Sequence, residues 1–172
     1  MKQSILGFFG LLVLALPQAA SAQNQNFWAS DQYTAKFLCG FAPGGEARLG
    51  VVAGHYNTII NVLAVRNSTA LAYRATALSS DFEIETGVPS EFSRRFDFDR
   101  DGGIGILCRD IKNLLLGGGS EGFIEGIVTI YGSKPLIVTD VLTSEDDAIS
   151  AMQVYEVERR SSSQRVRPPI LE

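Results

Sequence analysis

Two cysteines, Cys39 and Cys108, are the residues of this 172-residue sequence best suited to covalent chemistry. In a chain that passes through an oxidising compartment, such a pair joins by default as a disulfide. A bridge here would close a long loop and stabilise the fold by about 4 kcal/mol on the chain-entropy estimate. The alternative, a reactive thiol working with the single histidine, His55, requires a reduced cysteine. We therefore predict a Cys39–Cys108 disulfide and no catalytic residue.

A second pattern is the start of a calcium loop, in which Asp97, Asp99 and Asp101 precede Gly102 at alternate positions. Alternate carboxylates converge on a hard cation, and the glycine permits the sharp turn. However, the twelfth position of the loop requires a bidentate glutamate and here holds Cys108. The sequence therefore predicts a strand that ends in an Asp-Gly-Gly turn, with calcium binding by the three aspartates as the alternative. We predict no other metal and no cofactor.

Two more patterns resemble hydrolase motifs. Residues 118–122 match G-x-S-x-G, but that elbow must follow a strand and precede a helix. Here a predicted helix precedes it, and the histidine lies upstream of the serine, so we predict a glycine-rich loop. The carboxylates of Asp81, Glu83 and Glu85 alternate along a polar segment, as a glycosidase pair could. We predict a solvated edge strand instead, because alternation shows only that the three side chains share a face if the segment is extended.

Asn67 begins an Asn-Ser-Thr glycosylation acceptor pattern. The sequence predicts a turn there and does not decide whether Asn67 is modified. At the other end of the chain, residues 160–172 are rich in Arg, Ser and Pro, which predicts a disordered tail. The alternative is that this basic tail contacts an acidic surface.

The first 22 residues read as a signal peptide. Lys2 gives the positive start, the apolar run from Ile5 to Leu16 follows, and Ala20-Ser21-Ala22 fits the cleavage rule. The apolar run is shorter than the roughly 20 residues that a membrane-spanning helix needs. Loss of Lys2 with this leader lowers the formal net charge from −4 to −5. This acidity argues against nucleic acid as a partner.

Short apolar runs separated by Gly, Pro, Asn and Asp predict an all-β domain over residues 33–159, after a flexible lead-in at 23–32. The runs around the turn at 66–68 predict a hairpin. Asp110 and Gly117 predict the ends of one short helix at 110–116. Because no βαβ alternation appears, the best fit is a two-sheet antiparallel sandwich of immunoglobulin-like type, with seven or eight strands. The predicted strands are 34–41, 55–65, 70–78, 91–98, 104–108, 122–131, 136–142 and 152–158.

Several of these stretches together resemble a family of uncharacterised exported prokaryotic β-sandwich proteins. They are Ala35–Gly40, His55–Val62, Cys108–Ile111, Gly122–Val128 and Pro135–Val138. The last half of the chain is also distantly similar to the sensory rhodopsin transducer family, which shares the sandwich plan. These resemblances imply the fold and supply no catalytic residue.

The sequence thus predicts a non-catalytic protein, secreted or periplasmic, that acts through surface binding or structural assembly. Its expected partner is an envelope or extracellular protein or a polysaccharide, and it is not expected to span a membrane after cleavage. The expected contact surface is formed by the loops 42–54, 79–90 and 117–121. Aromatic candidates in or beside them are Phe41, Tyr56, Phe82, Phe92 and Phe123, although most of these side chains are expected to pack in the core. The alternatives are a carbohydrate-binding module, with an exposed row of Trp28, Tyr73 and Tyr131, and a hydrolase.

Overall fold

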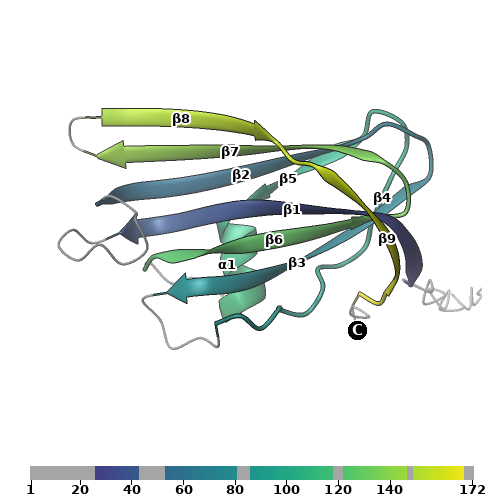
Figure 1. The fold of residues 1–172 in the computed structure, drawn as a ribbon, viewed down its shortest axis with the longest axis horizontal. Helices are drawn as coiled ribbons and strands as arrows, with labels where there is room; N and C mark the ends of the chain where they lie inside the picture. Colours follow the sequence, from purple (N-terminus) through teal and green to yellow (C-terminus); the bar gives the residue numbers. More distant parts are fainter. Residues whose placement is uncertain (1–25, 43–52, 81–85, 118–121, 147–148, 169–172) are drawn as a thin grey trace, which may run out of the picture.

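The protein, represented by a computed structural model, is described here for residues 26–42, 53–80, 86–117, 122–146 and 149–168. The predicted signal peptide at 1–22 lies outside these residues. The described chain is mostly β, with nine strands and one short helix, as Figure 1 shows. The elements are β1 Phe27–Ala42, β2 Gly54–Ala64, β3 Thr69–Ser80, β4 Phe96–Phe98, β5 Gly103–Leu107, α1 Cys108–Leu116, β6 Ile124–Gly132, β7 Leu136–Asp146, β8 Ile149–Glu156 and β9 Arg159–Val166.

All strand pairings are antiparallel, and the strands follow the order β4-β3-β6-β1-β2-β7-β8, with β5 beside β2 and β9 beside β1. The prediction of an antiparallel β fold is confirmed. The separation into two sheets is not, because β1 joins the two groups of strands. Its residues 31–39 pair with β6, and its last three, Gly40 to Ala42, pair with β2.

The main core follows from strict alternation along β1. Tyr33, Ala35, Phe37 and Cys39 are buried in it, whereas Thr34 and Lys36 between them are exposed. Successive side chains of a strand point to opposite faces, so this period of two buries one face of β1. The Tyr33 hydroxyl also accepts a hydrogen bond from the Leu136 N–H at 2.8 Å and donates one to the Leu136 carbonyl at 3.0 Å, which ties β1 to β7.

Strand β6 is the centre of its half of the sheet, with β1 on one edge and β3 on the other. Ile124, Val128 and Ile130 belong to the main core, and Tyr131 belongs to a second apolar cluster. Gly126 is required by close approach, because a Cβ there would lie 2.1 Å from the Thr76 carbonyl oxygen and 2.7 Å from the Phe37 ring.

Helix α1 lies behind the strands in Figure 1, and the disulfide fastens it there. The predicted Cys39–Cys108 bond is present, with 5.5 Å between the Cα atoms. It joins β1 to the first residue of α1 rather than one sheet to another. The helix starts two residues before the predicted position, and Asp110 caps it by accepting the Leu107 N–H at 3.0 Å. Gly117 ends it with a left-handed φ of 70°, as predicted.

Three sequence predictions about strands and termini were wrong. The region predicted as a disordered tail, 160–172, contains β9, whose pairing with β1 extends from Phe27↔Val166 to Tyr33↔Arg159. The predicted lead-in at 23–32 overlaps the start of β1 at Phe27. The first residues of β1 thus find their partner in β9, a polar segment from the other end of the described chain that apolar alternation does not locate.

The predicted hairpin between the second and third strands also does not form. Strand β2 pairs with β1, β5 and β7, whereas β3 pairs with β4 and β6. The short turn at 65–68 therefore carries the chain from one part of the sheet to another. A turn of this length permits a hairpin but does not require one. Which strands pair depends on the other partners that are available to each strand.

Candidate binding groove

A groove of about 560 Å³ opens where β9 and β2 leave one edge of β1 without a strand partner. Pairing with β9 stops at Tyr33 and pairing with β2 begins at Gly40, so no described strand pairs with this edge between them. Side chains of β7 and β8 form the opposite side. The lining residues are Thr34, Ala35, Lys36, Leu38, Asp140, Leu142, Gln153, Tyr155, Glu156, Val157, Glu158 and Arg160.

The backbone of β1 faces this groove at every second residue. The Thr58 side chain binds Leu38 from the β2 side, accepting its N–H at 2.9 Å and donating to its carbonyl at 3.0 Å. Backbone groups of a strand alternate between its two edges. The N–H and C=O groups of Thr34 and Lys36 therefore point to the same edge as those of Leu38, which is the edge along the groove.

Asp140 lies against the groove from β7 and is 3% exposed. Its Oδ1 atom has no hydrogen-bond partner among the described residues. Burial raises the pKa of Asp140 from 3.8 to about 6, because a buried carboxylate loses its hydration. The groove thus presents a buried carboxylate oxygen without a hydrogen-bond partner among the described residues, which favours a ligand that brings a cation or a hydrogen-bond donor.

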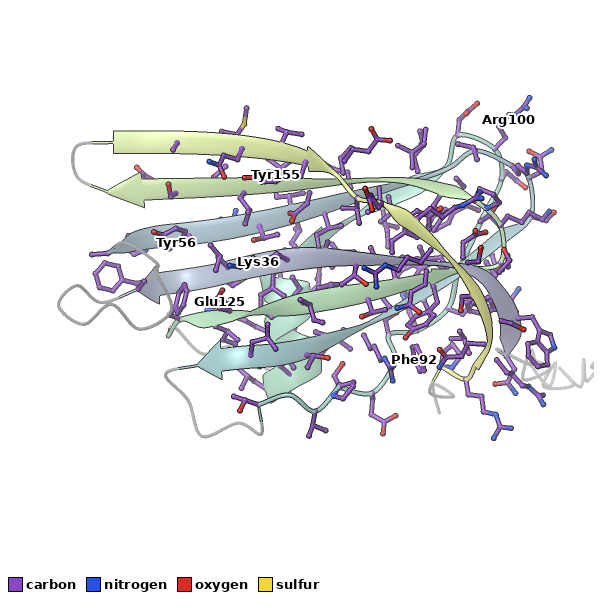
Figure 2. The ribbon with its side chains drawn as sticks, in the orientation of Figure 1. Lys36, Tyr56, Phe92, Arg100, Glu125 and Tyr155 are labelled. Atoms are coloured by element: carbon purple, nitrogen blue, oxygen red, sulfur yellow. A yellow bond between two sulfur atoms is a disulfide. The ribbon has the colours of Figure 1, made fainter. Side chains whose placement is uncertain are left out.

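An aromatic residue, Tyr155, and a basic residue, Lys36, also line the groove. Tyr155 is the cross-strand partner of Asp140 on β8 and is 49% exposed. At the β1 side, Lys36 Nζ binds Glu125 Oε1 at 2.6 Å, and Figure 2 labels these two side chains next to each other. The second carboxylate oxygen of Glu125 is buried without a partner among the described residues. The groove therefore combines apolar, aromatic, basic and acidic groups, as small-ligand sites do.

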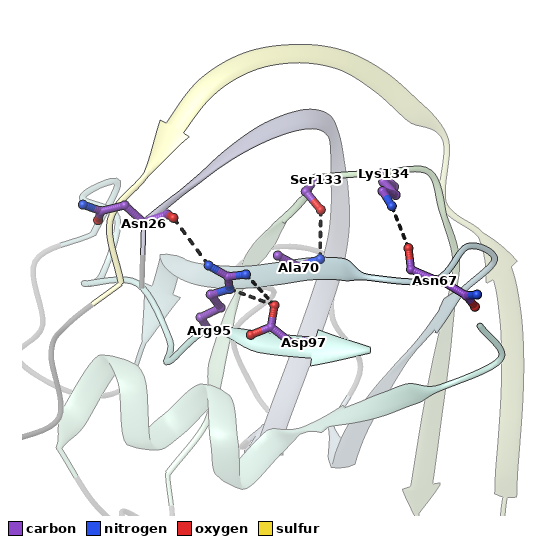
Figure 3. Close-up of polar contacts among 7 residues, drawn as sticks. All are labelled: Asn26, Asn67, Ala70, Arg95, Asp97, Ser133 and Lys134. Carbon is purple, nitrogen blue, oxygen red and sulfur yellow. Dashed lines mark hydrogen bonds and ion pairs between the residues drawn. The ribbon is translucent and has the colours of Figure 1, made fainter. Parts of the chain in front are cut away.

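The three aspartates considered for calcium are not brought together. Asp97 Oδ1 accepts two hydrogen bonds from Arg95, at 2.9 and 2.6 Å, which Figure 3 shows. Asp101 has a left-handed φ of 63° in the turn that Gly102 closes by donating to the Asp99 carbonyl at 3.1 Å. Among the described residues, no group of three His, Cys, Asp or Glu side chains is placed to hold a metal ion.

The other chemistry-bearing residues lie apart from the groove. His55 is exposed on β2, and its ring packs on Phe41 with centroids 4.8 Å apart. Asn67 is exposed, and its two oxygens accept hydrogen bonds from Arg100 N–H at 2.9 Å and from Lys134 Nζ at 2.6 Å, the latter drawn in Figure 3. The acidic run 81–85 and residues 118–121 of the G-x-S-x-G match lie outside the described residues.

The predicted aromatic surface forms only in part. Tyr73 and Tyr131 are buried, so the row proposed for carbohydrate binding is not present, although Trp28 is 66% exposed. Of the loop candidates, Phe41 is exposed and Phe123 is buried against Tyr56. The remaining two differ: Phe92 packs on Tyr131 with centroids 5.3 Å apart, and Phe82 lies outside the described residues. Most of the predicted contact loops 42–54, 79–90 and 117–121 also lie outside them.

The sequence analysis missed Asp140, although the sequence carries a signal for it. Leu136, Val138, Asp140 and Leu142 stand at alternate positions of one apolar strand. That period of two places the carboxylate on the same face as its apolar neighbours. Burial of Asp140 without a charged partner follows from this position. The sequence carries no signal for the gap in pairing along β1 that forms the groove.

Comparisons with known proteins give one distant structural match. No family model matches the chain, and no curated protein matches it. The crystal structure of Thermotoga maritima 1070 superposes with a TM-score of 0.44 and 11% identity, over 78% of this chain and 98% of that one. The described residues contain no helix long and apolar enough to cross a membrane. The Cys39–Cys108 disulfide is typical of proteins in oxidising compartments.

Proposed function

We propose that this chain is a non-catalytic, exported binding protein whose groove holds a short extended segment of an envelope or extracellular partner protein. The observation that carries the proposal is the unpaired edge of β1 along one side of the groove, between Tyr33 and Gly40. An extended peptide adds to such an edge through main-chain hydrogen bonds and gains specificity from neighbouring pockets.

The groove supplies both parts of this recognition. On the β1 side, the N–H and C=O groups of Lys36 and the C=O group of Thr34 face the groove, whereas the Thr34 N–H belongs to the last pair of the β1–β9 ladder. On the other side, Asp140 would accept a donor or ammonium group from the bound segment, and Tyr155 would pack on its apolar part. A hydrogen bond to the buried Oδ1 atom of Asp140 would contribute more to binding affinity than a surface contact does. The reason is that the folded protein already carries the cost of desolvating this oxygen.

Export and the layered architecture belong to the same proposal. The sequence of the leader and the disulfide both support an extracytoplasmic location. In a sandwich interpretation, β3, β4, β6 and β9 form one layer with β1, while β5, β7 and β8 form the other with β2. The groove then lies where the two layers separate along β1.

The test is selection of a displayed library of short random peptides on the purified mature protein, with affinities measured by calorimetry. Leu142→Trp fills the groove from β7, and Ile137→Trp adds the same bulk on the same strand at an exposed position outside the groove. We expect selected peptides to lose at least about tenfold in affinity with Leu142→Trp, which is 1.4 kcal/mol, and to bind Ile137→Trp as they bind the wild type.

Equal binding to both tryptophan variants would place the peptides elsewhere and refute the proposal. Absence of any selected peptide would also count against it. A glycan array probed with the same two variants covers the carbohydrate alternative, because glycan binding lost only in Leu142→Trp would assign the groove to sugars instead.

A further inference from the structure

Strand β8 has a long free edge that lacks the usual protection. It pairs with β7 without a register shift from Thr139↔Glu156 to Asp146↔Ile149, and no described strand pairs with its other edge. Natural edge strands are commonly blocked by Pro, Lys or a bulge. The β8 sequence ISAMQVYE contains neither Pro nor Lys, and its even register excludes a bulge. Met152 is 69% exposed and Val154 is 58% exposed.

The direction of the backbone groups along β8 is fixed by one hydrogen bond. The Val157 N–H donates to the Val138 carbonyl at 2.9 Å, in continuation of the β7–β8 register. Because backbone groups alternate between edges, residues of odd number turn theirs toward β7. Met152 and Val154 therefore turn their N–H and C=O groups to the free edge, together with Ser150 and Glu156.

We propose that β8 pairs antiparallel with β8 of a second copy of this chain, around a two-fold axis at Gln153. When two copies of a strand pair around a two-fold axis, the numbers of the paired residues have a constant sum. The residues that form hydrogen-bonded pairs must turn their backbone groups outward, and this limits where along β8 the axis can lie. With the axis at Gln153, Met152 of each copy lies opposite Val154 of the other, so the dimer contains two such pairs. The same axis places Tyr155 opposite Ala151 on the other face. An axis at Met152 or at Val154 would lose both Met152–Val154 pairs.

Antiparallel pairing brings the beginning of one β8 beside the end of the other, so that Glu156 of one copy lies opposite Ser150 of the other. The end of β8 carries both signs of charge, because the exposed Glu156 and Glu158 precede the exposed Arg159 and Arg160. The two Met152–Val154 pairs, rather than charge, therefore favour this register. This interface uses the outer edge of β8 and does not depend on the proposed peptide binding.

The first test is the mass of the mature protein in solution, measured by sedimentation equilibrium. We expect the wild type to be a dimer. Val154→Pro removes one N–H from the free edge and leaves the bonds to β7 in place, so it is expected to be monomeric. Val154→Thr keeps that N–H and a β-branched side chain, and is expected to remain a dimer. A wild type that is monomeric at its highest soluble concentration would overturn the proposal.

The second test is independent of how well the proline variant folds. Gln153 meets Gln153 of the other copy in a pair without mutual backbone hydrogen bonds, where Cα atoms are about 4.5 Å apart. Gln153→Cys should therefore form a dimer linked by a disulfide on mild oxidation. Tyr155→Cys should not, because its predicted neighbour is Ala151, whereas the double variant Ala151→Cys with Tyr155→Cys should. Crosslinking of Tyr155→Cys at the rate of Gln153→Cys would reject this register.

Discussion

Strands β6 and β8 have similar apolar content and opposite surroundings. β6 pairs along both edges, and its Ile124, Val128 and Ile130 have no measurable exposure. β8 pairs along one edge, and its apolar residues Met152 and Val154 are more than half exposed. The tyrosines of the two strands differ in the same way, with Tyr131 at 1% and Tyr155 at 49% exposed.

This difference shows that burial in a sheet is decided by position as well as by residue type. A central strand is covered by neighbours on both edges and by packing on both faces, so almost every side chain is removed from water. An edge strand of equal apolarity keeps one row of backbone groups and much of its side-chain surface free. Because β8 lies at the edge of the sheet, part of its apolar surface stays exposed and is available for an interaction.

The largest expected effect separates the two strands directly. Ile130→Ala removes buried methyl groups from the centre of the core and leaves a cavity, so we expect a loss of about 3 kcal/mol in the free energy of unfolding. Val154→Ala changes an exposed residue, and we expect less than about 0.5 kcal/mol. Urea unfolding at a protein concentration low enough to avoid association measures both. Equal losses would mean that β8 is as well packed as β6.

An effect whose upper limit is similar is expected at Asp140, which is buried although its cross-strand partner is the exposed Tyr155. Its pKa is raised to about 6 in the folded state, so the native protein holds this proton more tightly than the unfolded chain does. The free energy of unfolding should therefore fall as the pH rises from about 4 to 6. Asp140→Asn should remove this slope and stabilise the protein at pH 7 by up to about 3 kcal/mol.

The measurement is urea unfolding of the wild type and Asp140→Asn between about pH 3 and 7, a range that includes both the ordinary value of 3.8 and the raised value of about 6. Glu145→Gln, which removes an exposed carboxylate from the same strand, is the control and should leave the slope at Asp140 intact. A wild-type stability that rises through this range and is unaffected by Asp140→Asn would contradict the predicted sign.

The smallest effect concerns the hydroxyl groups of the two tyrosines. The Tyr131 hydroxyl accepts a hydrogen bond from Arg74 at 3.0 Å, and the same guanidinium packs over the Tyr131 and Phe92 rings. Tyr131→Phe leaves that partly buried guanidinium with one acceptor fewer, and we expect a loss of about 1 kcal/mol. Tyr155→Phe removes an exposed contact and should change stability by less than about 0.3 kcal/mol. Thermal unfolding of the two variants provides the comparison.

Much of the fold was predictable from the sequence because its cause is local. Alternation of apolar residues located most of β2, β3, β6 and β7 and the second half of β1, and Asp110 and Gly117 marked the ends of α1 closely. The Cys39–Cys108 disulfide was predicted from the presence of two cysteines in a chain with a predicted signal peptide. Of the strand predicted at 91–98, only β4, Phe96–Phe98, is present. The sequence analysis missed β9 because the polar sequence RRSSSQRV of that strand has no apolar alternation.

The sequence by itself determined the location of most strands and the end of the helix at Gly117, and its alternation places Asp140 on an apolar face. Only the tertiary structure decided which strands pair, and so created the open edge of β1, the groove beside it and the free edge of β8. The physical reason is that alternation is a property of neighbouring residues, whereas a strand's partners depend on competition among segments far apart in the chain.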